Sequence, residues 1–203
     1  MSQRNRTLIL LGVIAVLVVF VFAMERVAPP RVALIHDSYA TAVHPGARLL
    51  LDVSSGGIEV DSSESPELHV EYIDNGYEKG NPEVRVRTAN DKVEVRVNGL
   101  RGPARMRITV PKNTPMQVSM GAGQLIIMDV SGDKDITLYA GQVVIKGDPA
   151  QYGTIESKVL TGRINGRAIN VDKGGIARWI ARDGPGKSSL SVSLLAGEIA
   201  IDN

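Results

Sequence analysis

An arginine-rich segment is the part of the sequence best suited to chemistry. Residues 83–107 contain seven basic and three acidic residues, a local charge of +4. Guanidinium groups bind phosphate and carboxylate groups through paired hydrogen bonds, so on one face of a sheet they would contact anionic lipid headgroups or an acidic envelope polymer. The alternative is a solvated strand face whose charges discourage edge-to-edge pairing. The residues of this predicted site are Arg85, Arg87, Arg96, Arg105 and Arg107.

No other pattern predicts catalysis or metal binding. Ser131 and Lys134 have the Ser-x-x-Lys spacing of serine acyl enzymes, but that chemistry needs a helix, and Gly132-Asp133 predicts a turn. The absence of cysteine excludes disulfides, a thiolate nucleophile and a lipid-modified cysteine anchor. The histidines lack metal-ligand spacing; they are His36, His44 and His69. We therefore expect no catalytic, cofactor-binding or metal-binding residue.

A polysaccharide-active β-helix enzyme is the enzymatic alternative, since such enzymes cluster carboxylates on one exposed sheet. The candidate carboxylates stand at predicted turns, which is typical of solvated corners; they are Asp129, Asp133, Asp135 and Asp148. Trp179 is the single tryptophan. An exposed tryptophan would stack on sugar, but its apolar neighbours favour a side chain packed against the core.

The N-terminus predicts a membrane segment. Residues 7–24 carry no charge and follow Arg4 and Arg6, which predicts a single-pass signal-anchor helix with residues 1–6 in the cytoplasm. A signal peptide cleaved after Ala23 is the alternative, and the domain would then be secreted. A buried helix of a soluble protein would show a polar face, and this segment shows none. Either membrane interpretation places the C-terminal domain outside the cytoplasm, in the periplasm or at the cell surface.

Residues 25–46 are predicted to be a juxtamembrane connector, because Pro29-Pro30 and Pro45-Gly46 interrupt regular structure. Without Arg4 and Arg6, the remaining chain has 21 basic and 22 acidic residues. This near-neutral balance predicts no nucleic-acid partner.

Beyond residue 47 the sequence predicts strands. Apolar residues alternate with polar ones, as in a half-buried strand, and residues 83–97 predict a hairpin. Both phenylalanines lie in residues 7–24, so the core must be built from aliphatic side chains. We therefore expect an all-β domain.

A Gly-x-apolar-x-apolar pattern recurs five times, beginning at Gly56, Gly123, Gly141, Gly162 and Gly197. Glycine permits a tight corner, and the following apolar residues would point inward and stack on the next rung. Residues 47–203 are therefore predicted to form a single-domain β-solenoid, a β-helix-like repeat of short strands. An antiparallel β-sandwich with glycine-rich turns is the alternative.

The run Val-Pro-Lys-Asn-Thr-Pro-Met-Gln-Val-Ser-Met-Gly-Ala-Gly at residues 110–123, with the repeated strand starts after it, resembles the bacterial "putative adhesin" family. The resemblance covers residues 49–202. It implies an exported or membrane-anchored β-solenoid-like domain of unknown function, without catalytic residues to transfer. The aspartate usual in the family's repeats is replaced here by Gln124, Gln142 and Glu198.

These observations predict a non-enzymatic, envelope-anchored domain with a binding or scaffold role and no cofactor. Besides the membrane, its expected partners are an envelope polymer, lipid headgroups or a protein. The last strand, residues 197–201, has no obvious cap and predicts self-association. An ectodomain partner of an envelope-stress signalling system is a further alternative; six cytoplasmic residues are too few to signal, so it would need a membrane partner.

Overall fold

The computed structural model describes residues 31–35, 38–73, 82–89, 91–100 and 104–203, all within one compact unit, Arg31–Asn203. The predicted membrane segment, residues 7–24, lies outside them. Within the described residues, no helix has the length and apolarity needed to cross a membrane. They form twelve strands of one sheet that does not close, with two short 3-10 turns. The predicted all-β fold is confirmed.

The strands and turns follow one another along the chain as β1 (Arg31–Ile35), β2 (Ser38–Ala42), β3 (Arg48–Ser63), β4 (Glu67–Ile73), β5 (Glu83–Thr88), β6 (Lys92–Asn98), β7 (Arg105–Pro111), β8 (Met116–Met128), β9 (Lys134–Lys146), η1 (Pro149–Gln151), β10 (Tyr152–Gly166), η2 (Arg167–Ile169), β11 (Val171–Asp183) and β12 (Ser188–Asp202).

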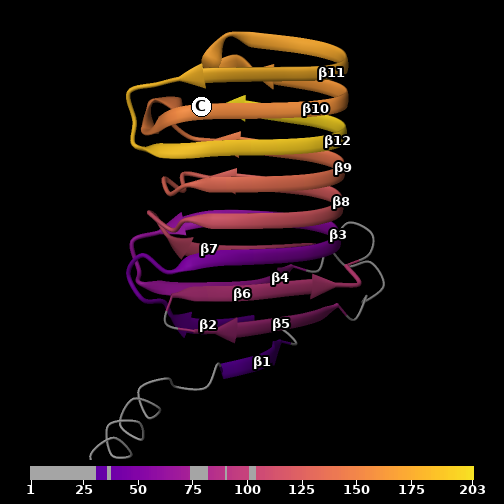
Figure 1. Cartoon of the computed structure of the whole chain (residues 1–203). Helices are drawn as coiled ribbons and strands as arrows, with labels where there is room; N and C mark the ends of the chain where they lie inside the picture. The colour runs from indigo at the N-terminus through magenta and orange to yellow at the C-terminus, as the bar shows by residue number, and fades with distance from the viewer. Residues whose placement is uncertain (1–30, 36–37, 74–81, 90, 101–103) are drawn as a thin grey trace, which may run out of the picture. The chain divides into compact units, whose positions relative to one another are not determined.

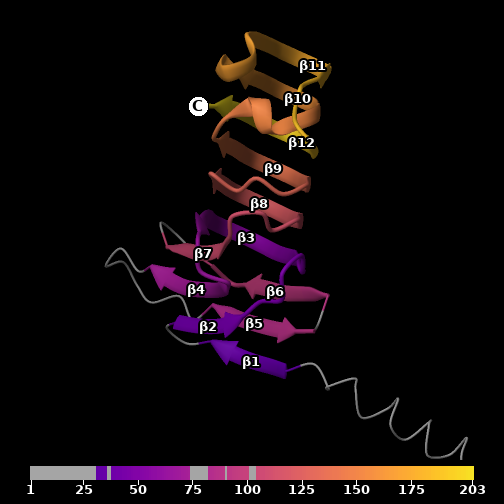
Figure 2. The ribbon, with the colours of Figure 1, turned by 90° about the vertical axis from the view of Figure 1, so that its left-hand side faces the viewer.

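Five long strands pair in parallel and form the middle of a stack, in the order β3, β8, β9, β12, β10 (Figure 1). Each bends near its middle at a glycine, so its two halves lie in different layers (Figure 2). We call the layer with β1, β5 and β6 the first layer, and the layer with β2, β4 and β7 the second layer. The pairing aligns the bend glycines in one column: Gly56, Gly123, Gly141, Gly197 and Gly162.

The strands do not stack in chain order. The glycine repeat predicts consecutive rungs, but the C-terminal strand β12 lies between β9 and β10 and pairs in parallel with both. Strand β10 instead leads into β11, which runs back antiparallel and is the last strand of the described stack. The predicted self-association assumed that the C-terminal strand has an unpaired edge. Both edges of β12 are paired, so this edge is not available.

Below β3 the two layers separate. The first half of β3 pairs with β6, which continues to β5 and β1, and its second half pairs with β7, which continues to β4 and β2. The predicted hairpin over residues 83–97 is confirmed as the antiparallel pair β5–β6. Strands β1 and β2 fall within the predicted connector, residues 25–46, so the folded unit begins at Arg31 rather than at residue 47.

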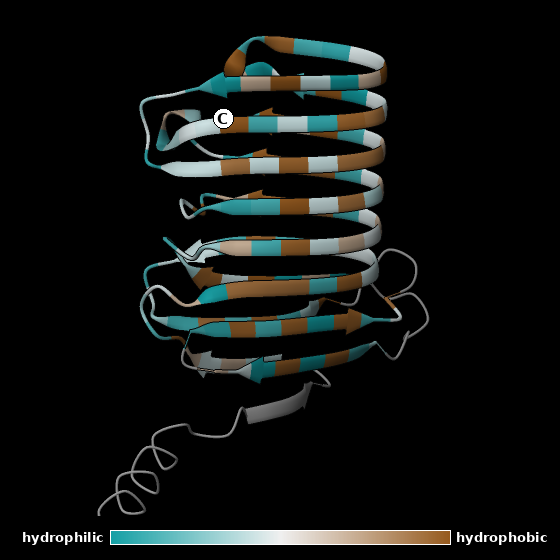
Figure 3. Ribbon diagram, in the orientation of Figure 1, coloured by the Kyte–Doolittle hydropathy of each residue, from teal (hydrophilic) through white to brown (hydrophobic). Residues whose placement is uncertain are grey.

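The core between the layers is almost entirely aliphatic. Inward and outward positions alternate on either side of the bend in the five parallel strands, which Figure 3 shows as alternating brown and teal bands. Among the described residues the core contains one fully buried aromatic side chain, Tyr152, while Tyr39 and Tyr72 pack at its margin. The buried residues of this core run from Val43 to Ile201, so all of them lie within the unit Arg31–Asn203.

The glycine column brings the backbones of neighbouring strands into close contact. The bend glycines have φ near +130°, a conformation that other residues rarely adopt. A Cβ atom on Gly141 would lie 1.8 Å from the carbonyl oxygen of Gly123, and one on Gly197 would lie 1.8 Å from that of Gly141. Each glycine is thus required by its own φ and by the strand beside it.

We expect Gly141→Ala to lower the free energy of unfolding of the unit by at least about 3 kcal/mol, because it adds backbone strain and a clash with a carbonyl group. Gly174→Ala in β11 is the matched control, since its Cβ would meet nothing closer than 3.9 Å. Urea unfolding followed by circular dichroism measures both variants. Equal midpoints for the two would contradict a structural role of the column.

Candidate functional site

The structure separates the five predicted site arginines into two sets. Arg85 and Arg87 lie on β5 and Arg96 on β6, all in the first layer, with Arg85 directly opposite Arg96. Arg105 and Arg107 lie on β7 in the second layer. Strand β3 changes layer at its bend, so β6 and β7, which pair with its two halves, diverge. The five side chains therefore do not share one face.

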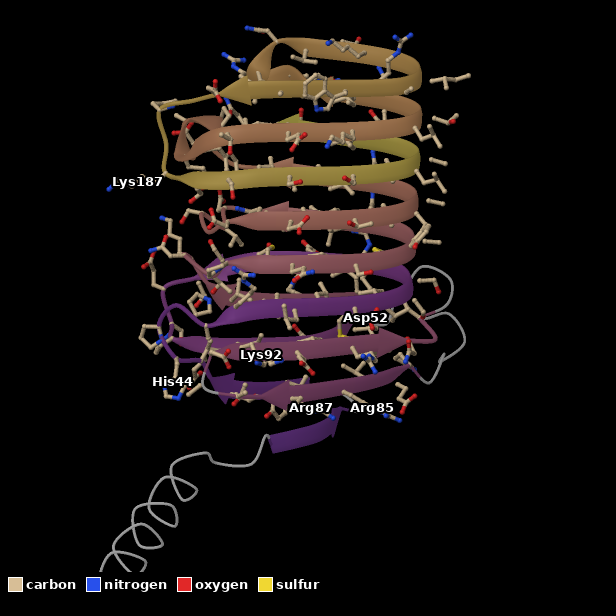
Figure 4. The ribbon with its side chains drawn as sticks, viewed as in Figure 1. His44, Asp52, Arg85, Arg87, Lys92 and Lys187 are labelled. Atoms are coloured by element: carbon tan, nitrogen blue, oxygen red, sulfur yellow. The ribbon has the colours of Figure 1, made fainter. Side chains whose placement is uncertain are left out.

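The first-layer set belongs to a basic face at the β1 end of the stack (Figure 4). We define the basic face by its outward cations, Arg48, Arg85, Arg87, Lys92 and Arg96. Three carboxylates on the same strands lie among them, which leaves a net charge of +2 for the strand residues; they are Asp52, Glu83 and Glu94. Asp91, exposed in the turn before Lys92, lowers the local charge to +1. An open recess of about 280 Å³ lies between the arginines.

Ion pairs orient the arginines of the basic face, and the paired side chains still remain exposed to solvent. Arg96 Nε lies 3.1 Å from Asp52 Oδ2, Arg87 lies 3.8 Å from Glu94, and Arg85 pairs with Glu83. The three arginine side chains remain 55–60% exposed. A guanidinium group has five N–H donors, so donors remain for a bound anion after each of these contacts.

In the second layer, two carboxylates neutralise Arg107. Arg107 lies 3.5 Å from Glu59 and 3.4 Å from Asp61, and Glu71 stands opposite it on β4. Burial, and then the nearby charge of Glu59, raise the pKa of Asp61, while Arg107 lowers it. With Glu67, the outward acidic residues of this region outnumber its two arginines. The base of the stack is therefore basic on one layer and acidic on the other.

A strip of exposed apolar side chains lies at the other end of the stack. Its members come from four neighbouring strands in the order β9, β12, β10, β11, and we call them the apolar strip: Tyr139, Leu195, Leu160, Ile176 and Trp179, with exposed fractions of 49–73%. Figure 3 shows the hydrophobic colour continuing onto the bends of β10 and β12. An open groove of about 520 Å³ runs beside the strip. Contiguous exposed apolar side chains mark interaction surfaces.

Three of the five members of the strip come from one position of the repeat. Tyr139, Leu195 and Leu160 each stand two residues before a bend glycine, where β3 and β8 carry Ser54 and Gly121. Aligned glycines bring these positions side by side at the outer edge of the bend. Reading the residue two places before each glycine would have revealed these three members in the sequence, but not Ile176 and Trp179 of β11.

Trp179 is exposed, so the prediction that it packs against the core is wrong. Its exposed fraction is 55%, while the next residue, Ile180, is buried. Because side chains alternate along a strand, Trp179 points outward beside Lys158 of β10. The indole N–H donates to Glu156 at 3.3 Å, and Lys158 lies 2.8 Å from the same carboxylate.

A polar ladder follows the glycine column on the second layer. Gln124 donates to Gln142 at 2.7 Å, and Gln142 donates to Glu198 at 3.4 Å. These are the positions at which the resembled family usually carries aspartate. Neutral amides allow side chains on neighbouring rungs to bond to one another, whereas adjacent carboxylates would repel.

Three cations close the β11 end of the stack. Lys173, Arg178 and Arg182 occupy inward positions, opposite buried residues of β10. Their head groups turn back to backbone carbonyls: Arg178 donates to Gly174 and Arg182 to Ile169, each at 2.7 Å, and Lys173 donates to Trp179 at 3.5 Å. The aliphatic stems cover the core, while the charges oppose the addition of another strand.

We expect replacing these three cations with valine, as Lys173→Val/Arg178→Val/Arg182→Val, to cause end-to-end association, because the variant exposes both an apolar core and an unpaired strand edge. Analytical ultracentrifugation of the unit Arg31–Asn203 measures the mass. The control removes three exposed cations that do not contact β11, as Lys112→Val/Lys146→Val/Lys187→Val. An unchanged mass for the first variant would contradict the capping role.

Ser131 and Lys134 do not form a catalytic pair. The Ser131 hydroxyl bonds to Lys112 O and Asn113 Oδ1, whereas Lys134 Nζ donates to Gly132 O at 2.8 Å. Lys134 is buried, with its ammonium group 4.8 Å from the centroid of the Tyr152 ring. Burial lowers the pKa of Lys134 to about 7, against an opposing effect of Asp133, and burial raises the pKa of Tyr152.

The pKa of Lys134 predicts a pH dependence of stability. Between its folded pKa of about 7 and its ordinary value of 10.5, the unfolded chain holds a proton that the folded chain lacks, so stability rises with pH in this window. Lys134→Met should remove that slope and raise the free energy of unfolding at pH 6 by at least about 1 kcal/mol. Lys146→Met, an exposed position of the same strand, should leave it unchanged. Urea unfolding from pH 6 to pH 10 measures the free energy of unfolding of both variants. If Lys134→Met still became more stable with rising pH, the pH dependence would belong to another group.

Among the described residues, no group of three or more histidine, aspartate or glutamate side chains is arranged to hold a metal ion. His44 lies in the turn before β3, and Figure 4 shows it at the edge of the stack. His69 lies on β4. His36 falls outside the described residues.

Comparison with known proteins gives one similar solved structure and no family. No protein-family model and no curated protein match the chain. The solved structure is described as a putative cell adhesion protein from Clostridium sporogenes; it is 16% identical, has a TM-score of 0.46, and aligns over 85% of this chain and 99% of that chain. We therefore build the function from the geometry alone.

Proposed function

We propose that this chain is a non-enzymatic binding module of a bacterial envelope, anchored by residues 7–24, with the unit Arg31–Asn203 outside the cytoplasm. The apolar strip carries the binding role, because five large apolar side chains on four adjacent strands remain exposed. The anchor is supported by the uncharged length of residues 7–24 and by Arg4 and Arg6 before it.

We also propose that the parallel part of the stack is a β-solenoid that acts as a spacer. Its support is the in-register pairing of five bent strands around one glycine column. Strand β1, the point at which the chain enters the unit, stands at the opposite end from β11. At about 4.8 Å per strand, the strip begins roughly 24 Å from β1 and ends roughly 38 Å from it. The module would thus present its binding surface away from its anchor.

The chemistry beside the strip favours binding over hydrolysis of a polysaccharide. Glu156 is the carboxylate next to Trp179, and hydrogen bonds from Lys158 and Trp179 lower its pKa. Glycoside hydrolysis by paired carboxyl groups needs one of them protonated as the general acid. A carboxylate held in its ionised form is suited to accepting hydrogen bonds and does not provide that acid.

The strip can be tested in the full chain by photo-crosslinking in cells. A photoreactive residue at position 160, in the strip, should give discrete adducts, and a second substitution, Leu195→Glu, should remove them because it charges the neighbouring strip position. The same residue at position 119, on the outward face of β8, is the control and should give none. Adducts of equal yield at both positions, or none at position 160, would refute binding through the strip.

A further inference from the structure

We propose that the basic face binds the phosphate groups of anionic lipid headgroups in the membrane that holds the chain. This inference rests on the proposed membrane anchoring but not on the apolar strip, which lies at the other end of the stack. The basic face and its recess have no role in the proposed binding through the strip.

The arrangement of guanidinium groups suits a phosphate. Arg85 and Arg96 are cross-strand neighbours, and Arg87 is the next outward residue on β5, so three guanidinium groups border one recess. Each meets a carboxylate through one side and keeps further N–H donors exposed. Guanidinium groups bind phosphate oxygens through two parallel hydrogen bonds, and a recess of about 280 Å³ leaves room for a headgroup phosphate.

The position of the face points to the membrane as the source of the phosphate. Strand β1 pairs with β5, with Val32 opposite Arg87 and Leu34 opposite Arg85. Only residues 25–30 separate β1 from the end of the predicted anchor. Six residues reach at most about 20 Å, which keeps the basic face within reach of the headgroup region. An acidic polymer elsewhere in the envelope is not held near the basic face by a short connection of this kind, so the position favours the lipid headgroups.

The charge asymmetry of the base gives the contact a direction. The strand residues of the basic face carry a net charge of +2, whereas the second layer presents Glu59, Asp61, Glu67 and Glu71 around Arg105 and Arg107. A negatively charged membrane surface attracts the first face and repels the second. The headgroup contact would therefore orient the whole stack relative to the bilayer.

The test uses the unit Arg31–Asn203, which contains the complete core, so that the anchor does not dominate binding. Vesicles containing phosphatidylglycerol should bind the unit, and vesicles of phosphatidylcholine alone should not. The variant Arg85→Gln/Arg87→Gln/Arg96→Gln should bind at least roughly tenfold more weakly, because each cation near an anionic surface contributes to the attraction. Binding should also weaken as salt is added. Co-sedimentation measures these affinities.

The control variant Lys146→Gln/Arg163→Gln/Lys187→Gln removes the same charge from exposed positions elsewhere and should bind like the wild type. Thermal unfolding of both variants checks that they fold. The proposal is overturned if the wild-type unit ignores anionic vesicles, if both variants lose binding equally, or if inorganic phosphate binds at the arginines while the vesicles do not. Leu160→Glu/Leu195→Glu should retain vesicle binding. Failure of the proposed binding through the strip can therefore be told apart from failure of the proposed lipid binding by the basic face.

Discussion

The close contact between bend glycines is the constraint on which the rest of the structure depends. The carbonyl group of one glycine occupies the space where a side chain of the next glycine would begin, 1.8–2.0 Å from its Cβ position. This contact permits neighbouring strands to bend at the same place and only in one register. Once Gly56, Gly123 and Gly141 are aligned, every inward side chain stacks on an inward side chain of the next strand.

A fixed register also organises the surface, because each position of the repeat becomes a row across the strands. The position two residues before the glycine supplies three side chains of the apolar strip, and the position after it forms the ladder through Gln124, Gln142 and Glu198. The stack has two different ends: arginines and their carboxylates at the β1 end, and inward cations at the β11 end. The two proposed contacts, one with the membrane and one with a partner, would therefore lie at opposite ends of one stack.

The order of the strands is the feature that the repeat leaves open. Bent strands with equivalent glycines fit against any other strand of the same kind, so Gly197 aligns with Gly141 as readily as with Gly162. The inward positions of β11 carry Lys173, Arg178 and Arg182, which a strand inside the stack could not accommodate without burying unpaired charge. Strand β11 is thus suited only to the end of the stack, and β12, the last strand of the chain, occupies the position between β9 and β10.

The sequence alone determined the all-β class, the β5–β6 hairpin, the aliphatic core and the bend glycines, because these follow from local alternation and from backbone limits at single residues. Only the tertiary structure decided that β12 lies inside the stack, that β1 and β2 belong to the folded unit, and that Trp179 is exposed. It also divided the five arginines, since the bend in β3 sends β6 and β7 to different layers. Such choices depend on pairing between distant segments, and the local period of two carries no information about which strands become neighbours.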